Sequence, residues 1–302
     1  MSGFETKPLY DRFGVEITGL DLADAVQPAH FAVLRALFEE HSALLFRGQS
    51  MTPEMHMQLA ALFGPIEDRK ADERKAGEAF DISQVSNIAK DGTLTGDMDL
   101  HTLNLKSNLL WHSDSTFLPV PALTNVLTAH VVTTTGGATE LASTRAAFAD
   151  MPAERQDTLR TMLFRHHFSQ SRARISAELA KLPMFNKWPE QQWPAVWKNP
   201  VNGAEAIYVA SHVRGIVGME QESAMAFVDA LIEGCTQPAY VYSHSWTPGD
   251  VLIWDQRAVL HRGTPWPSDQ ARRLASICAS ATDADGLAQM RSRKAELLAL
   301  QG

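Results

Sequence analysis

The sequence predicts an α+β protein whose core is an antiparallel sandwich or jelly roll with flanking helices. Several short strand-like segments lie close together, with turn residues such as Pro248 and Gly249 between them, and segments with helical spacing flank them. In addition, no glycine-rich phosphate loop follows any strand-like segment. That observation argues against a nucleotide-binding α/β fold.

Two helices with a short buried strand between them are predicted near the start of the chain. Apolar residues recur at helical spacing over 28–41, and Thr52 is a suitable N-cap for a second helix within 52–64. Between them, SALLFRG (42–48) has the continuous apolar character of a buried strand.

A long polar loop is predicted over residues 66–108, interrupted by the strand-like segment 82–88. Long loops in compact domains are often functional. We therefore expect an active-site loop or lid at about 66–108.

Helices and strands are mixed in the remainder of the chain. Residues 144–164 and 219–234 have helical patterns. The adjacent His166 and His167 follow the first of these helices, where we expect them to be partly exposed. Strands are predicted at 123–132, 136–142, 239–246, 250–255 and 272–280.

The composition is that of an ordinary globular protein. The 302 residues are 45% hydrophobic and 21% charged. The net charge of -8, from 27 basic and 35 acidic residues, gives no electrostatic reason to expect nucleic acid or an anionic membrane as a partner. We therefore expect a small-molecule substrate, with neither nucleic acid nor membrane as a partner.

The cysteines and the N-terminus favour a cytoplasmic protein. Cys235 and Cys278 lie in unrelated segments without a C-x-x-C or framework pattern, which suits reduced thiols. The first residues contain no apolar stretch behind a basic start, and no later apolar run approaches membrane-spanning length.

The segment WHSDSTF (111–117) carries His112 and Asp114 two residues apart. On an extended strand both side chains would point to the same face, so an imidazole and a carboxylate would converge. His261, just past the predicted strand 250–255, is the third candidate ligand. Two histidines and one carboxylate form the facial triad of non-haem Fe(II) oxygenases, which leaves positions for a co-substrate and O2, whereas zinc more often closes its shell or uses three ligands plus water.

A lone His-x-Asp pair is more often part of a solvated loop than of a metal site, but two further features support the metal site. Arg272 begins the last predicted strand, where its guanidinium could bind the distal carboxylate of a dicarboxylate. Gly136 and Gly137 leave room beside the backbone, and the Thr139 hydroxyl supplies a second donor. Jointly these features describe a 2-oxoglutarate site.

The motifs W-H-S-D-S-T-F, G-G-x-T-E and W-D-x-R-x-x-x-H-R together resemble those of the taurine dioxygenase / 2,4-dichlorophenoxyacetate dioxygenase family of Fe(II)/2-oxoglutarate enzymes. The resemblance runs from about Gly14 to about Ser280 and implies a single domain, 1–302, with a double-stranded β-helix core. A homo-oligomer is also expected. The implied iron ligands are His112, Asp114 and His261, and the implied 2-oxoglutarate contacts are Thr139 and Arg272, with Asn108 nearby.

The resemblance also implies the reaction. Such an enzyme uses Fe(II), O2 and 2-oxoglutarate to hydroxylate its substrate, with release of succinate and CO2. The expected substrate is a small organic acid or ether, for example an aryloxyalkanoate. A sulfonate or an N-substituted amino acid is an alternative within the same family.

One position departs from the family pattern. Four residues after the 2-oxoglutarate arginine, family members carry an arginine that binds the carboxylate or sulfonate of the substrate, and here that position is Ser276. The substrate is therefore expected to be differently oriented, differently charged or larger. Candidate substitutes for the missing arginine are Lys106, Arg172, Arg174 and His212, although a residue of each of these kinds is more often a solvated charge.

Two other classes of protein remain open at this point. A zinc or iron hydrolase could use the same triad, in which case Arg272 and Thr139 would be incidental and activity would not need 2-oxoglutarate. A non-catalytic jelly-roll binding protein would use the histidines and Asp114 for structure only, and it would not bind ferrous iron.

Overall fold

The structure is a computed structural model, and it describes residues 3–75, 77–78, 80–96 and 100–300 of the chain. Its largest sheet has seven strands in the order β1-β2-β3-β13-β5-β15-β4, antiparallel except for the parallel β2–β3 pair. The strands of this sheet are β1 (Glu5–Pro8), β2 (Val15–Thr18), β3 (Ala43–Phe46), β4 (Ser83–Ser86), β5 (Ala122–Val131), β13 (Val251–Asp255) and β15 (Arg273–Ser280).

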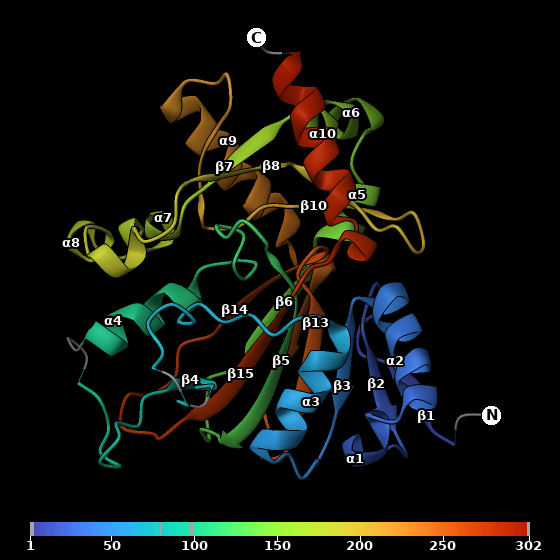
Figure 1. Cartoon of the computed structure of the whole chain (residues 1–302), viewed down its shortest axis with the longest axis vertical. Coiled ribbons are helices and arrows are strands. Elements are labelled where there is room, and N and C mark those ends of the chain that lie inside the picture. Colours follow the sequence, from blue (N-terminus) through green and yellow to red (C-terminus); the bar gives the residue numbers. More distant parts are fainter. Residues whose placement is uncertain (1–2, 76, 79, 97–99, 301–302) are drawn as a thin grey trace.

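A smaller antiparallel sheet, in the order β12-β6-β14, packs against the large one (Figure 1). It consists of β6 (Thr139–Ser143), β12 (Val241–His244) and β14 (Val259–Gly263). Leu127 and Leu252 of the large sheet share one buried cluster with Leu141 and Val259 of the small sheet. The two sheets therefore enclose a common apolar core, as the expected jelly roll requires.

Helices α2 (Pro28–His41) and α3 (Pro53–Phe63) cover the other face of the large sheet (Figure 1). Phe38 of α2 and Phe63 of α3 belong to the same buried cluster as Ile253 of β13. Because both faces of the central strands are covered, β3 and β13 are apolar along almost their whole length instead of alternating. Both helices and β3 agree with the sequence prediction, including the Thr52 cap, which accepts from the Met55 amide at 3.2 Å.

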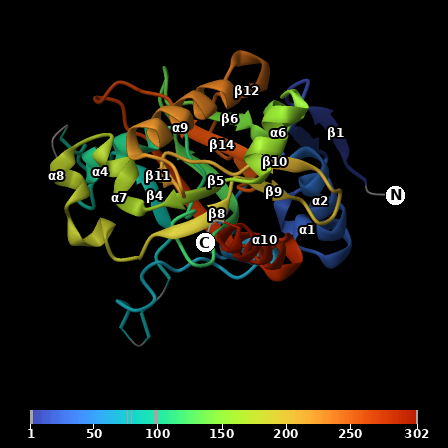
Figure 2. The ribbon, with the colours of Figure 1, turned by 90° about the horizontal axis from the view of Figure 1, so that it is seen from above.

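Smaller elements complete the fold. Helices α4 (Leu100–Lys106), α7 (Phe168–Ala173) and α8 (Ala177–Ala180) lie on the side of the molecule opposite α1 (Leu22–Ala25) and α2 (Figure 2). None of the helices in the described part of the chain is long and apolar enough to cross a bilayer. The remaining α-helices and strands of the described residues are α5 (Thr144–Ala149), α6 (Ala153–Arg160), β7 (Leu163–His166), β8 (Gln191–Pro194), β9 (Val196–Lys198), β10 (Glu205–Ile207), β11 (Val213–Ile216), α9 (Gln221–Cys235) and α10 (Leu287–Ala299).

The prediction of one helix over 144–164 is wrong. Two short helices, α5 and α6, are separated around Pro152, whose missing N–H and fixed φ suit a helix start and not a helix interior. The chain then enters β7, which pairs with β8 and β11. His166 is consequently 0% exposed, not partly exposed as expected.

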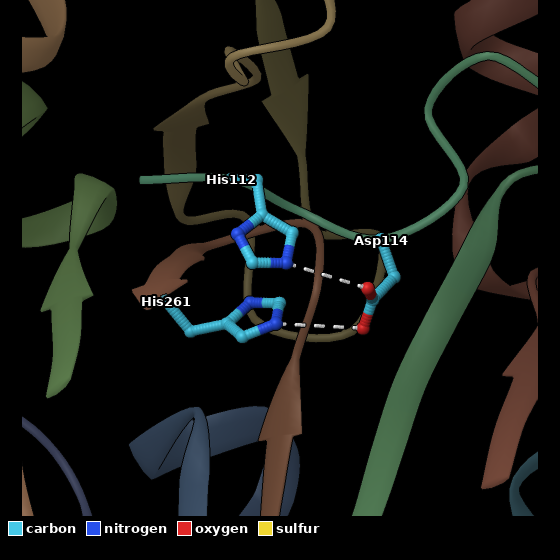
Figure 3. Close-up of side chains that lie close together, drawn as sticks. All are labelled: His112, Asp114 and His261. Atoms are coloured by element: carbon cyan, nitrogen blue, oxygen red, sulfur yellow. Dashed lines mark ion pairs between the residues drawn. The ribbon is translucent and has the colours of Figure 1, made fainter. Parts of the chain in front are cut away.

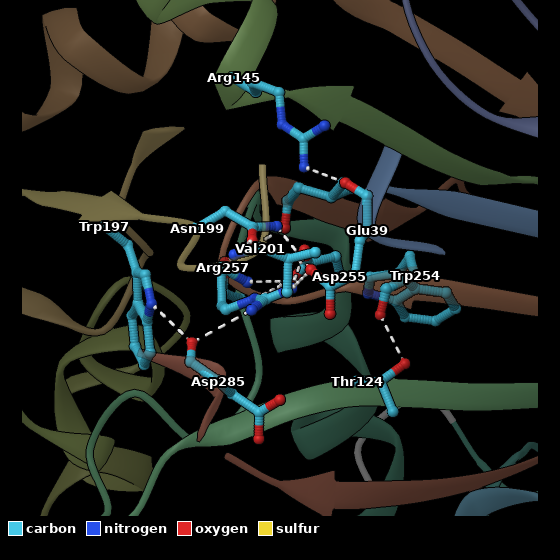
Figure 4. A network of polar contacts seen from close by, with 12 residues as sticks. Glu39, Thr124, Arg145, Trp197, Asn199, Val201, Trp254, Asp255, Arg257 and Asp285 are labelled. Carbon is cyan, nitrogen blue, oxygen red and sulfur yellow. Dashed lines mark hydrogen bonds and ion pairs between the residues drawn. The ribbon is translucent and has the colours of Figure 1, made fainter. Parts of the chain in front are cut away.

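A buried ionic network fixes the turn between β13 and β14 (Figure 4). The Arg257 guanidinium donates to Glu39 at 2.6 Å, to Asp255 at 2.9 Å and to the Asp285 carbonyl at 3.1 Å. Burial alone would raise the pKa of Glu39, but Arg257 and Arg35 lower it below its usual value. The network thus joins α2, the β13–β14 turn and the segment before α10.

We expect Arg257→Ala to lower the free energy of unfolding by about 3–5 kcal/mol, because Asp255 would stay buried without its cation and Glu39 would keep only Arg35. Urea denaturation of the variant and the wild type measures this difference. The control is Arg12→Ala, which removes an exposed ion pair with Asp150 and should change the stability far less. Similar losses in the two variants would contradict the structural role assigned to Arg257.

Candidate active site

Three predicted ligands converge in space (Figure 3). The Nε2 atom of His112 lies 3.8 Å from one oxygen of Asp114, and Nε2 of His261 lies 3.6 Å from the other. One possible ligand atom from each residue falls within 4.8 Å of the other two. The cluster has the donor set and the spacing of a facial triad.

Backbone pairing explains why His112 and His261 meet although they are far apart in sequence. The His112 amide donates to the His261 carbonyl at 3.0 Å, and the His261 amide donates to the His112 carbonyl at 2.8 Å. The two residues are therefore directly opposite each other in an antiparallel bridge beside β14. Asp114 lies in a turn and not on a strand, so the predicted convergence is found but the extended geometry assumed for it is not.

The protonation states also suit a metal. Burial lowers the pKa of His261 to about 3 and lowers that of His112, so both imidazoles are neutral. Burial by itself raises the pKa of Asp114, but the neighbouring imidazoles and the Asn125 amide hold it below its usual value. His112 Nδ1 lies 2.7 Å from the Leu110 carbonyl, which places the proton there and leaves Nε2 free to bind a metal. Two neutral imidazoles and a carboxylate are the forms in which these groups ligate divalent iron.

Three residues that the sequence analysis did not identify hold the carboxylate. One Asp114 oxygen accepts from the Asn125 amide at 2.8 Å and from the Gln256 amide at 2.6 Å, and the Cys278 thiol lies 3.6 Å away. The Ser276 hydroxyl donates to the side-chain oxygen of Asn125, Oδ1, at 2.9 Å and so orients the Asn125 side-chain amide. The only local signal for Asn125 was an amide side chain inside the strand LTNVLTA, whose other residues are apolar or threonine.

A cavity of about 180 Å³ opens beside the triad. Of the predicted site residues, the structure brings six to its wall besides the triad: Asn108, Thr139, Arg172, His212, Arg272 and Ser276. Lys106 and Arg174 are not among its lining residues, and Arg174 instead pairs with Asp229 at 2.6 Å. Arg69, which was not predicted, also lines the cavity, from the start of the 66–108 segment.

Arg272 is a buried cation at this wall. Its Nε and one terminal nitrogen donate to the Gly137 carbonyl at 3.2 and 2.9 Å, and its guanidinium lies 4.7 Å from the Trp266 ring centre. Burial lowers its pKa to about 10, so it stays charged at neutral pH. Gly137 has a φ of 67°, and a Cβ there would lie 3.1 Å from Arg272 Nε, so the close approach needs glycine.

Thr139 begins β6 and is 3% exposed. Its hydroxyl oxygen accepts from the Trp246 indole at 3.0 Å. An indole N–H only donates, so the Thr139 hydroxyl proton remains available to donate toward a ligand. Thr139 and Arg272 thus present donors to one cavity, as the co-substrate prediction requires.

Comparison with known proteins gives consistent results. Residues 5–278 match the family model described as taurine catabolism dioxygenase TauD, TfdA family. The chain is 32% identical over 277 residues to the (S)-phenoxypropionate/alpha-ketoglutarate-dioxygenase of Sphingobium herbicidovorans, with 89% of this chain and 92% of the relative covered. It is 29% identical over 270 residues to the alpha-ketoglutarate-dependent 2,4-dichlorophenoxyacetate dioxygenase of Cupriavidus pinatubonensis, with 88% and 94% covered.

The crystal structure of AAD-2 in complex with Mn(II) and N-oxalylglycine has a similar fold. The TM-score is 0.85 at 28% sequence identity, and the match covers 92% of this chain and 97% of that chain. This likeness confirms the predicted α+β class with a jelly-roll core, and the sequence comparisons confirm the family resemblance.

Proposed function

The chain belongs to the taurine catabolism dioxygenase TauD, TfdA family and is an Fe(II)- and 2-oxoglutarate-dependent dioxygenase, for which we propose His112, Asp114 and His261 as the iron ligands. The observation that carries this assignment is the convergence of these three side chains at a cavity that Arg272 also lines. Family membership argues against the hydrolase and the non-catalytic binding protein.

We propose that Arg272 binds the distal carboxylate of 2-oxoglutarate, with Thr139 as a second donor and Asn108 nearby. The guanidinium is already held by the Gly137 carbonyl and the Trp266 ring, so little ordering is needed when the anion binds. Bound Fe(II) supplies the O2 chemistry that couples decarboxylation of 2-oxoglutarate to hydroxylation of the substrate. The chain holds Asp114 in place through the side-chain amides of Asn125 and Gln256.

The substrate that we propose is a small organic acid or ether, with an aryloxyalkanoate as the first choice. Support comes from the relatives that act on phenoxypropionate and 2,4-dichlorophenoxyacetate. A sulfate ester or sulfonate is the second choice, because the chain is also 24% identical over 265 residues to the alpha-ketoglutarate-dependent sulfate ester dioxygenase of Pseudomonas putida.

We also propose a single domain, 1–302, in which residues 66–108 act as a lid. Arg69, Asn104, Leu105 and Asn108 from this segment line the cavity. Strand β4 within the segment is held by its pairing with β15, so the movement that opens or closes the site would involve the described residues on either side of β4. We further propose that the protein is a cytoplasmic, homo-oligomeric enzyme of catabolism and that it has neither nucleic acid nor a membrane as a partner.

An anaerobic titration tests the proposed function. Metal-free protein that receives Fe(II) and then 2-oxoglutarate should develop the visible charge-transfer absorption of a chelated keto acid. Phenoxyacetate should then stimulate succinate release in air. A folded protein without the absorption band would contradict the assignment of iron and 2-oxoglutarate.

A further inference from the structure

Arg172 is a buried cation on the cavity wall that neither the proposed iron site nor the proposed 2-oxoglutarate site uses. It lies on α7 and is 7% exposed. Its guanidinium packs over the Phe168 ring at 4.2 Å and the Phe185 ring at 4.9 Å. These contacts fix the side chain in one position at the cavity.

The polar partners of Arg172 are neutral. Nε and one terminal nitrogen donate to the Asn104 side-chain oxygen at 3.2 and 2.8 Å, and the other terminal nitrogen donates to the Ser171 hydroxyl at 2.7 Å. A guanidinium has five N–H donors. Among the described contacts three are used, so one N–H on each terminal nitrogen remains, the arrangement that grips a carboxylate or sulfate.

Three arginines are buried in the described part of the chain: Arg172, Arg257 and Arg272. Arg257 pairs with the carboxylates of Glu39 and Asp255. Arg272 and Arg172 donate only to neutral groups within that part, and both line the same cavity. A buried cation without a hydrogen-bonded carboxylate is costly, so each of these two positions favours an anion.

The reaction has two organic anions, if the substrate is an acid. Arg272 is the proposed partner of 2-oxoglutarate. Ser276 stands where family members carry the arginine that binds the substrate anion, and a serine cannot neutralise a charge. Its hydroxyl is instead used to orient Asn125, which holds Asp114. The substrate anion must therefore be bound elsewhere on the wall.

We propose that Arg172 binds the anionic group of the primary substrate, so that Arg272 and Arg172 divide the two organic anions between them. This inference rests on the proposed function. Burial, with the nearby charge of Arg69, lowers the pKa of Arg172 to about 9, so it is still a cation at neutral pH.

Aromatic rings connect Arg172 to the triad. Phe168 stacks on Phe117 at 4.0 Å between ring centres, and Phe117 lies 4.9 Å from His212. The His212 ring in turn lies 6.2 Å from the ring of His112. A substrate held by Arg172 would rest its apolar body on this wall, so the fitting class is an organic anion with an aryl or alkyl group between the anion and the reacting carbon.

Equilibrium dialysis under anaerobic conditions tests the inference with two anionic probes, phenoxyacetate and hexyl sulfate, and the neutral probe phenoxyacetamide. The protein carries Fe(II) and 2-oxoglutarate, and the variants are Arg172→Gln, Arg172→Lys and Arg174→Gln. Arg174 is the matched control, because it follows on the same segment but pairs with Asp229 outside the cavity wall.

In wild type, at least one anion should bind more tightly than phenoxyacetamide. Arg172→Gln should weaken the binding of that anion by about 30-fold, the order expected for loss of a charge-assisted hydrogen bond. It should leave phenoxyacetamide binding and the 2-oxoglutarate absorption band nearly unchanged. The anion affinity of Arg172→Lys should lie between those of wild type and Arg172→Gln, since lysine keeps the charge but lacks the paired N–H donors of the guanidinium. The anion affinity of Arg174→Gln should match that of wild type.

Anion binding that is unchanged in Arg172→Gln would overturn the inference, as would a wild type that binds neither anion or binds phenoxyacetamide equally well. Equal loss of 2-oxoglutarate and anion binding would also overturn it. If Arg172→Gln does not fold, Arg172→Lys takes its place: anion binding as tight as in wild type would then overturn the inference. Absence of the absorption band in the wild type would instead overturn the proposed function, and this inference with it.

Discussion

Replacing His112 with alanine is expected to abolish both the Fe(II)/2-oxoglutarate absorption band and substrate-dependent succinate release. His112 supplies one of three possible ligand atoms that lie within 4.8 Å of one another, and the cluster of described residues contains no imidazole besides those of His112 and His261. Loss of a residue that merely supports a ligand costs about 10–100-fold in metal affinity or activity. Loss of the ligand itself should therefore exceed about 100-fold.

Asn125→Ala is the comparison that separates a ligand from a supporting residue. The variant loses one of the two amide donors to Asp114 but keeps all three ligand atoms. We expect the band to return at about 10–100-fold higher Fe(II). A His112→Ala protein that keeps its circular dichroism spectrum and forms the band at the wild-type Fe(II) concentration would exclude His112 as a ligand.

The three proposed ligands could be identified from sequence because their chemistry is carried by short motifs. His112 and Asp114 stand two residues apart, and His261 follows a strongly apolar strand. Neither fact requires knowledge of the backbone. What the sequence does not contain is the cause of the convergence, the reciprocal amide–carbonyl pair between His112 and His261, since a β-bridge between distant residues leaves no local pattern.

The supporting residues could not be predicted for a related reason. Asn125 lies on β5 and Gln256 in the turn after β13. Their side-chain amides can both donate to one oxygen of Asp114 only because the fold brings these two segments together. The substrate candidates show the same limit. Arg172 and Arg174 differ by about 200° around a helix, so α7 directs the first to the cavity and the second to Asp229.

The fold was predictable where one periodicity extends over a whole element. Helical periodicity extends over 28–41 and 219–234, and apolar strand character extends over the predicted strands 42–48, 123–132, 250–255 and 272–280, whereas β1 and β2 of the large sheet were not predicted. The segment 144–164 does not meet this condition, because Pro152 interrupts it and β7 is stabilised by pairing with β8 and β11, which are distant in sequence. Tertiary pairing therefore overrides the local helical pattern there.

Replacing Arg272 with glutamine is expected to raise the 2-oxoglutarate concentration for half-maximal absorption by about 10- to 100-fold. Loss of a hydrogen bond to a charged group costs about 1.5–3 kcal/mol. The iron ligands are untouched, so the final band intensity should be retained at saturating 2-oxoglutarate. The band should therefore shift in its concentration dependence without disappearing, which distinguishes this variant from His112→Ala.

Arg273→Gln provides the matched control for Arg272. The two arginines are adjacent, but Arg273, the first residue of β15, is exposed, while Arg272 directly before the strand is 3% exposed at the cavity wall. Removal of either cation changes the net charge equally, so a general electrostatic effect on a dianion would appear in both variants. We expect the shift only in Arg272→Gln, because only its guanidinium can contact the co-substrate directly. Equal shifts in the two variants would show that long-range charge, and not a specific contact, governs 2-oxoglutarate affinity.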